Sequence, residues 1–328
     1  MEQWLLIVGA AVSVFAVIGV GAGTRQLGWL SEEADQSLLK LILRVLVPCL
    51  IFSVVSDNPA LKQTSNLIIP PAIGFVTIVI GFAAALLVTR LPSRWNGLRN
   101  FRERRSFAMS TGIYNYGYIP IPLIKLLFDD QTLGLLFVHN IGAEMAIWTV
   151  GVSLISSREG GRGWRHVLNP PSVTILVALV VNFLGIADWV PKPLDTAIDW
   201  LGQAAIPMSM ILIGATIADQ LAIGGKDSRG PAASAKLIGW ACLLRLALLP
   251  MAFLAVGLMV PGSIELKRVI VIEAAMPAAV FPILLARLYG GDPGTALRVA
   301  LGTSLLSLLT IPLWIPAGLK LLGIAGLG

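Results

Sequence analysis

The stretch that decides the fold lies between residues 111 and 122 and reads TGIYNYGYIPIP. Its two prolines, Pro120 and Pro122, stand inside an apolar run that is long enough to cross a bilayer. A proline inside a helix removes one backbone donor and frees the carbonyl four residues before it, here those of Tyr116 and Tyr118. Free carbonyls at membrane depth are tolerated where they line a cavity or bind a cation. This stretch therefore predicts a broken transmembrane helix with a binding site at the break.

A second stretch, residues 273–282, has the same design and reads EAAMPAAVFP. Pro277 and Pro282 free the carbonyls of Glu273 and Ala278 in the same way. The half-helices that begin at the two breaks direct backbone N–H groups and a positive dipole end toward them, which favours an anion. Ordinary proline kinks without a binding role are the alternative.

The composition places these two stretches in an all-α polytopic membrane protein. Of the 328 residues, 56% are hydrophobic and only 13% are charged, and the mean hydropathy is +0.83, so a soluble fold could not hide the apolar surface. Ten apolar segments are long enough to span a bilayer. We expect them at residues 3–24, 36–56, 67–89, 105–128, 131–156, 170–187, 196–218, 234–260, 268–289 and 295–319.

The distribution of basic residues predicts the orientation. The loops after odd-numbered segments carry 14 lysines and arginines, against five on the other side. By the positive-inside rule the odd loops face the cytoplasm, so we expect a multi-pass protein of the inner membrane with both termini outside, in the periplasm. The net charge of +6 is explained by these loops and does not indicate nucleic acid. The arginine-rich run 90–105 is expected to contact anionic lipid.

The order of glycine and proline residues predicts two repeats. The series Gly28, Pro48, Pro120, Pro122 recurs at similar spacing as Gly185, Pro207, Pro277, Pro282. Five segments per repeat is an odd number, so the second repeat must enter the membrane from the opposite side. We expect inverted five-helix repeats at residues 1–157 and 158–328, an architecture that secondary transporters use.

Short sequences along nearly the whole chain together resemble the auxin efflux carrier family of permeases, in its short bacterial form. They are Gly19-Val20-Gly21 with Leu27-Gly28, Leu46-Val47-Pro48, Asn115-Tyr116-Gly117-Tyr118 before Pro120-Ile121-Pro122, Leu168-Asn169-Pro170-Pro171, Ile213-Gly214-Ala215, Tyr289-Gly290-Gly291-Asp292 and Ile311-Pro312-Leu313. One departure is that the segment around Pro277 lacks the asparagine of the plant-type crossing.

The resemblance implies ten transmembrane helices, with helices 4 and 9 broken and crossing each other. Spans 1, 2, 6 and 7 would form a scaffold, often a homodimer interface, and spans 3–5 and 8–10 a transport domain that moves as an elevator. It implies a carrier of a small organic anion, such as the dicarboxylates malate and malonate.

The candidate site residues follow from the two breaks and from the ionisable residues at membrane depth. We expect the substrate at Asn115, Tyr116, Gly117, Pro120, Pro277 and Ala278. Glu273 and Glu144 are the candidates for coupling transport to Na⁺ or H⁺, although Glu144 has a structural role or a contact with Arg245 as alternatives. For Arg44 and Arg245 we favour snorkelling to the headgroups, with attraction of an anionic substrate as the alternative.

No resident cofactor or metal is expected, because the two histidines and two cysteines fit no known metal spacing. Three other functions stay open: a sodium symporter of the bile-acid type, an intramembrane enzyme, and a receptor that does not transport.

Overall fold

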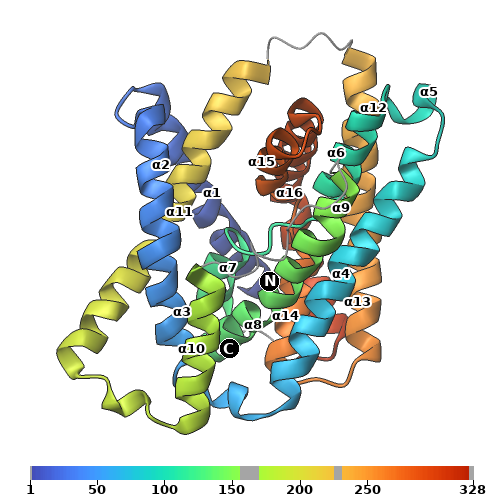
Figure 1. The fold of residues 1–328 in the computed structure, drawn as a ribbon. Coiled ribbons are helices and arrows are strands. Elements are labelled where there is room, and N and C mark those ends of the chain that lie inside the picture. The colour runs from blue at the N-terminus through green and yellow to red at the C-terminus, as the bar shows by residue number, and fades with distance from the viewer. Residues whose placement is uncertain (1, 156–169, 225–230, 325–328) are drawn as a thin grey trace.

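The computed structural model describes residues 2–155, 170–224 and 231–324. These residues are helical, apart from connecting loops and one isolated antiparallel bridge between Tyr114 and Ala278 (Figure 1). Within them, seven helical segments are long and apolar enough to cross a membrane, and Pro170–Leu184 is a shorter apolar helix. The prediction of an all-helical, multi-pass architecture is therefore confirmed. The expected repeat boundary between residues 157 and 158 lies outside the described residues.

The first part of the chain contains twelve described elements. They are α1 (Glu2–Gln26), α2 (Glu32–Leu41), η1 (Ile42–Leu46), α3 (Val47–Val55), η2 (Pro59–Lys62), α4 (Ser65–Thr89), α5 (Ser93–Asn96), α6 (Phe101–Gly112), α7 (Pro120–Leu127), α8 (Asp130–Ala146), η3 (Ile147–Gly151) and α9 (Val152–Ile155). The π-helical turns η1 and η3 continue the helices on either side of them without a break.

The second part of the chain contains nine described elements. They are α10 (Pro170–Leu184), η5 (Ala187–Trp189), α11 (Lys192–Gly224), α12 (Pro231–Leu243), η6 (Leu244–Leu248), α13 (Leu249–Met259), α14 (Ile264–Ala275), α15 (Phe281–Leu288) and α16 (Pro293–Leu321). The structure interrupts the chain at both predicted breaks, between α6 and α7 and between α14 and α15. Pro70, Pro71 and Pro207 lie inside continuous helices, so a proline alone does not interrupt a helix here.

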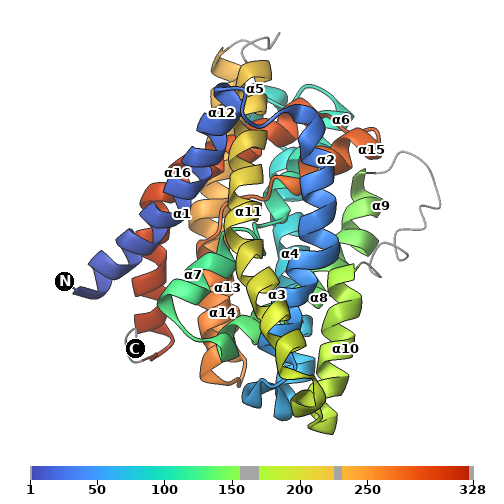
Figure 2. The ribbon, with the colours of Figure 1, turned by 90° about the vertical axis from the view of Figure 1, so that its left-hand side faces the viewer.

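One group of helices consists of α1, α3, α10 and α11. α11 packs on α1 and α3, and α10 packs on α3 (Figures 1 and 2). The contact between α1 and α11 is close because both helices present glycines: a Cβ on Gly21 would overlap the carbonyl of Ile211, and one on Gly214 would overlap the carbonyl of Ile18. Asn182 of α10 ties this group together by donating hydrogen bonds to the carbonyls at the end of α3 and just after it.

The second group contains α4, α6, α8, α12–α14 and α16. α4 packs on α6 and α8, and α16 packs on α6, α12 and α14. Glycines again allow the closest contact: a Cβ on Gly74 would overlap the carbonyl of His139, and one on Gly142 would overlap the carbonyl of Pro71. In each group, therefore, glycines let the backbones of one helix pair approach closely: α1 and α11 in the first group, and α4 and α8 in the second.

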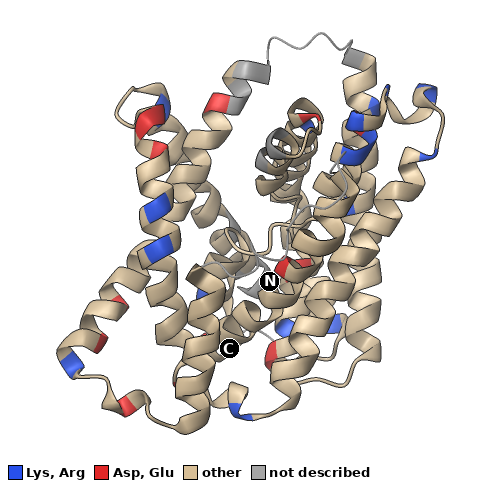
Figure 3. Cartoon of the chain, viewed as in Figure 1, with Lys and Arg blue, Asp and Glu red and all other residues tan. Residues whose placement is uncertain are grey.

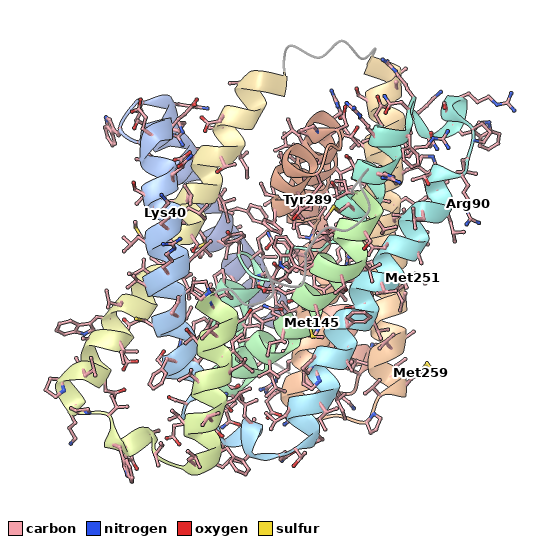
Figure 4. All side chains as sticks on the ribbon, in the orientation of Figure 1. Lys40, Arg90, Met145, Met251, Met259 and Tyr289 are labelled. Carbon is pink, nitrogen blue, oxygen red and sulfur yellow. The ribbon has the colours of Figure 1, made fainter. Side chains whose placement is uncertain are left out.

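The outer surface is apolar. Met251 and Met259 on α13 point away from the body of the molecule (Figure 4), with 60% and 82% of their surface exposed. Charged residues lie mostly toward the ends of the helices, and basic residues gather around α5 and the start of α6 (Figure 3). An apolar exterior with charged ends is the pattern expected of helices in a bilayer.

Candidate functional site

The two breaks meet at one point in the middle of the fold. The backbone N–H of Asn115 donates a hydrogen bond to the carbonyl of Pro277 at 2.8 Å, and the N–H of Ala279 donates to the carbonyl of Ile113 at 2.9 Å. These two bonds form the antiparallel bridge of the fold. The two non-helical segments thus satisfy part of each other's backbone, which membrane burial demands.

Four helix ends converge on this crossing. α6 and α14 end there, and the half-helices α7 and α15 begin there, each with a proline in its first two positions. Proline suits this position because its missing N–H would be unpaired in a first turn anyway. The two helices that begin at the crossing direct their N-terminal dipole ends at it, which stabilises negative charge nearby.

Asn115 opens the first break and is 5% exposed. Its side-chain oxygen lies 3.4 Å from the backbone nitrogen of Ile119, which donates to it just before α7 begins. The side-chain nitrogen of Asn115 makes no hydrogen bond with a described residue. Asn115 is therefore placed to order the start of α7.

Tyr116, Gly117 and Pro120 lie along the same break. The carbonyl of Tyr116, which Pro120 frees, accepts a 2.7 Å hydrogen bond from the side chain of Asn140 on α8. Tyr116 and Gly117 are half-buried, and no heavy atom lies within 4 Å of the point where a Cβ on Gly117 would stand. There is therefore open space beside the middle of the first break.

Pro277 and Ala278 form the second break and are buried. The carbonyl of Pro277 is occupied by Asn115, and the N–H of Ala278 donates to the hydroxyl of Thr303 on α16 at 3.1 Å. The carbonyl of Glu273, which Pro277 frees, accepts a weak bond from the N–H of Met276 at 3.3 Å. Most polar backbone groups of this break thus have protein partners.

Glu273 lies on α14 beside the crossing and is 2% exposed. Neither of its carboxylate oxygens has a hydrogen-bond partner among the described residues. It interacts electrostatically with Arg245, the largest fully buried side chain of the described residues. The prediction that Arg245 snorkels to the headgroups is wrong. Its guanidinium turns inward because η6 packs against the crossing, and its Nε donates to the carbonyl of Met276 at 3.1 Å.

Aromatic rings surround this guanidinium. Its central carbon lies 5.2 Å from the ring centroid of Tyr114 and 4.8 Å from that of Phe253, distances at which a cation is attracted to a ring face. The hydroxyl of Tyr114 lies 3.0 Å from that of Thr77 on α4. The ring of His139 lies 6.4 Å from that of Tyr114, and its Nε2 has no described partner. The crossing is thus enclosed by titratable and aromatic side chains.

Glu144 lies away from this cluster. It is half-buried on α8 and accepts a 3.1 Å hydrogen bond from Ser172 on α10. It also interacts electrostatically with Tyr116. Glu144 therefore stands where the second helix group touches the first, whereas the carboxylate that interacts electrostatically with Arg245 is that of Glu273.

A cavity of about 590 Å³ lies between the two helix groups. Residues of α1, α3 and the first half of α11 line one side of it, and Pro122, Lys125 and Leu126 of α7 line the other. Near the second half of α11, around Thr216 and Val280, the corresponding space is only about 10 Å³, which holds no more than one water. The larger cavity therefore lies beside the Lys125 end of α7, and a much smaller one lies beside the second half of α11.

Comparison with known proteins identifies the family of this chain. The family described as "Membrane transport protein" matches residues 6–163 and 160–315. The chain belongs to this family. It is the auxin efflux carrier family that the sequence resembles, so that prediction is confirmed.

Relatives of this family member align over almost their full length. An uncharacterized transporter of Methanothermobacter thermautotrophicus is 25% identical, covering 92% of this chain and 95% of the relative. Auxin efflux carrier component 8 of Arabidopsis thaliana is 21% identical, covering 89% and 93%. A Rhizobium meliloti protein named "Putative malonate transporter" is 25% identical, covering 93% of each chain. The relatives are named as transporters, and the chain is accordingly a multi-pass membrane transporter.

Several residues at the crossing of this transporter escaped prediction from the sequence. Arg245, His139 and Asn140 sit in apolar runs whose periodicity does not show which face meets the crossing. Thr77 and Thr303 are ordinary residues of membrane helices in sequence. Their roles depend on which helices pack together. A polar residue in each apolar run was the only available signal.

Proposed function

We propose that this protein is a secondary active transporter that moves a small organic anion of the dicarboxylate class, such as malonate or malate. The observation that carries the proposal is the crossing, where Asn115 and Pro277 join two broken helices by a backbone hydrogen bond. Broken helices that meet in the middle of a membrane protein are the usual site of a transported ion or solute. The relative named for malonate supports the choice of dicarboxylates.

The crossing favours an anion for three reasons. The half-helices α7 and α15 both begin there, so two positive dipole ends converge on it. The side-chain amide of Asn115 is placed to donate to a carboxylate. Open space beside Gly117 gives a ligand room next to these donors. Within this proposal Asn115, Tyr116, Gly117, Pro120, Pro277 and Ala278 surround the substrate.

An elevator mechanism is part of the proposal. Close glycine contacts hold α1 to α11 and α4 to α8, and a cavity of about 590 Å³ lies between α1, α3 and α11 on one side and α7 on the other. This favours rigid groups that slide past each other, with spans 1, 2, 6 and 7 as the scaffold. We further propose a scaffold-mediated homodimer.

Ten membrane crossings in two inverted repeats complete the proposed architecture. The broken pairs α6–α7 and α14–α15 each count as one crossing in it. Gly28 and Gly185, equivalent in the repeats, both have left-handed φ angles, of 73° and 67°, after α1 and α10. Matching helix ends of this kind support a repeat. The proposal places the chain in the inner membrane, with both termini outside.

Coupling to H⁺ or Na⁺ is assigned to Glu273, with Glu144 as the second candidate. The Glu273 carboxylate lies at membrane depth with no hydrogen-bond partner among the described residues, so it is free to take up a proton or bind a cation. Glu144 has Ser172 as a partner and stands between the helix groups, where its role depends on their movement.

Uptake of radiolabelled malonate into proteoliposomes tests the function. We expect accumulation driven by an imposed proton or sodium gradient, and loss of accumulation in Asn115→Asp, which keeps the acceptor for Ile119 but adds a negative charge. Recovery of the label as unchanged malonate separates transport from an enzymatic reaction. Uptake equal to that of protein-free liposomes for every dicarboxylate tested would refute the proposal.

A further inference from the structure

Arg245 and Glu273, two buried residues of opposite charge, lie at the crossing, and no hydrogen bond between them is present. Arg245 is 0% exposed and Glu273 is 2% exposed, and each interacts electrostatically with the other. Neither carboxylate oxygen of Glu273 and neither terminal nitrogen of Arg245 has a hydrogen-bond partner among the described residues. The two residues therefore influence each other through their charges, and both retain unused hydrogen-bonding capacity.

The guanidinium is the fixed member of this pair. Its Nε is bound to the carbonyl of Met276, and the rings of Tyr114 and Phe253 lie against it. An arginine keeps its charge at any physiological pH, whereas a carboxylate can take up a proton. The net charge of the pair is therefore set by Glu273: zero when Glu273 is ionised, and +1 when it is protonated.

A buried positive charge without a counter-charge is costly, so Arg245 requires one negative charge nearby. Glu273 supplies it when no ligand is present. An anion that reaches the crossing would supply it as well, because Coulomb attraction acts across several ångströms where the surroundings are apolar. A dicarboxylate dianion together with an ionised Glu273 would place three negative charges around one guanidinium, and protonation of Glu273 reduces this excess by one.

We propose that Arg245 couples anion binding at the crossing to the protonation of Glu273. When the anion arrives, it becomes the counter-charge of Arg245, and the Glu273 carboxylate takes up one proton from water to form a neutral carboxylic acid. When the anion leaves, that O–H bond breaks and the proton returns to water. No other bond changes. Arg245 is a positioning residue in this scheme and does not need to touch the anion.

This inference rests on the proposed function and selects its coupling ion. With the anion bound, a proton on Glu273 and a sodium ion beside it would each add one positive charge. The sodium ion, however, would have to lie near the fixed positive charge of Arg245, which repels it, whereas a proton on Glu273 forms a neutral acid. The resident guanidinium thus takes the place that a bound cation would have.

The other titratable groups around Glu273 do not supply the missing charge. α14 packs on α7, α8, α13 and α16, and the break of the first broken helix lies against it. Tyr114 and Tyr116 of that break interact electrostatically with Glu273, and both are neutral in their protonated form. His139 of α8 stands beyond Tyr114.

The other helices that pack on α14 supply no negative charge either. α13 has no ionisable residue, and Lys125 of α7 is paired with Asp130. The charged residues of α16 are Arg298 and Lys320, both cations.

Calorimetric titration of the purified protein with malonate tests the proposal. Measurements in two buffers of different ionisation enthalpy count the protons taken up on binding. We expect about one proton per malonate in the wild type, and an affinity that falls about tenfold per pH unit where Glu273 is ionised before binding. Glu273→Gln should bind malonate with no proton uptake and no such pH dependence.

Variants of Arg245 separate coupling from structural support. Arg245→Lys keeps the charge and should keep proton uptake. The double variant Arg245→Gln with Glu273→Gln removes both charges, so that neither remains buried alone, and should bind more than tenfold more weakly at every pH. Arg44→Gln on η1 and Glu265→Gln at the start of α14 are the matched controls and should behave as wild type.

A second arm needs no substrate. With Arg245 as the resident counter-charge, exchanging K⁺ for Na⁺ should leave the melting temperature of the wild type unchanged. A sodium-specific stabilisation that Glu273→Gln removes would overturn the inference, and so would malonate binding without proton uptake. Both results leave the proposed function standing. Failure of every dicarboxylate to bind or to enter liposomes would instead refute the proposed function, and with it the proton coupling.

Discussion

The side chain of Asn140 on α8 donates a 2.7 Å hydrogen bond to the carbonyl of Tyr116, the carbonyl that Pro120 leaves without a helical partner. The oxygen of the Asn140 amide lies 3.3 Å from Nδ1 of His139. The first break is thus stabilised by a hydrogen bond from a neighbouring helix.

Replacing Asn140 by alanine should destabilise the break. The Tyr116 carbonyl would then lack its partner, and an unpaired polar group in an apolar surrounding costs about 1–3 kcal/mol. We expect a lower melting temperature in detergent, together with weaker malonate binding. Ser153→Ala, which removes a hydroxyl bound only to its own helix, is the control. An unchanged melting temperature for Asn140→Ala would show that the break does not need this bond.

Asn115 should contribute to binding more than to folding. Asn115→Ala removes a long, 3.4 Å contact with Ile119 and an amide donor at the crossing. The yield of folded protein should stay near that of wild type, while malonate affinity falls by about 1–3 kcal/mol, or roughly 5- to 150-fold. The yield is measured after purification, and the malonate affinity is measured by thermal-shift titration. Wild-type affinity in this variant would remove Asn115 from the site.

At the glycines where two helices touch, replacement by a larger residue should destabilise the protein. A Cβ at Gly142 would overlap the backbone of Pro71, so Gly142→Ala must push α8 away from α4. Overpacking of this kind typically costs about 1–3 kcal/mol, and backbone neighbours cannot move aside. Gly239→Ala on α12 meets nothing within 4 Å and serves as the control. Equal melting temperatures for the two variants would contradict the close packing of α4 and α8.

Asp129 should make stability depend on acidity. It lies between α7 and α8, where Arg268 of α14 binds its carboxylate at 2.7 Å. Partial burial raises the pKa of Asp129, but hydrogen bonds from Thr132 and the charge of Arg268 outweigh it and hold the pKa below its ordinary value of 3.8. Because the folded pKa is the lower one, the stabilisation is complete above the ordinary value and is lost as the pH falls through the folded value.

Melting curves across acidic pH test this linkage. Wild type should lose stability more steeply than Asp129→Asn as the pH falls below about 4, and the two should differ most near neutral pH. Asp57→Asn, at an exposed position, controls for the general effect of acid. Parallel curves for wild type and Asp129→Asn would show that the ion pair with Arg268 contributes nothing.

The orientation can be tested with fusions at the C-terminus. The excess of 14 basic residues over five in opposite loops predicts that both termini face outward. Alkaline phosphatase fused to the C-terminus should therefore be active, and a fluorescent protein fused there should be dark. The reverse pattern would overturn the orientation and the proposed number of crossings.

The sequence predicted the elements well where the signal is local. Apolar length predicted the long helices, and the paired prolines predicted both interruptions, because a missing N–H and a clash with the preceding turn act on the residues next to the proline. Pro207 shows the limit of this reasoning: it lies within α11, a helix of 33 residues that continues through it. Packing by neighbouring helices decides whether a proline breaks a helix or is absorbed.

The amino-acid sequence by itself determined the membrane class, the family and the two places where the chain leaves the helix, because hydropathy and proline chemistry depend on residues and their near neighbours. Only the tertiary structure decided that Arg245 points inward to the carbonyl of Met276 and that Asn140 binds the carbonyl of Tyr116. An arginine in an apolar run has the same local pattern whether it faces headgroups or the interior. Which alternative holds depends on whether a distant segment brings a carbonyl, an aromatic face and a counter-charge within reach, and that is fixed only when the two broken helices cross.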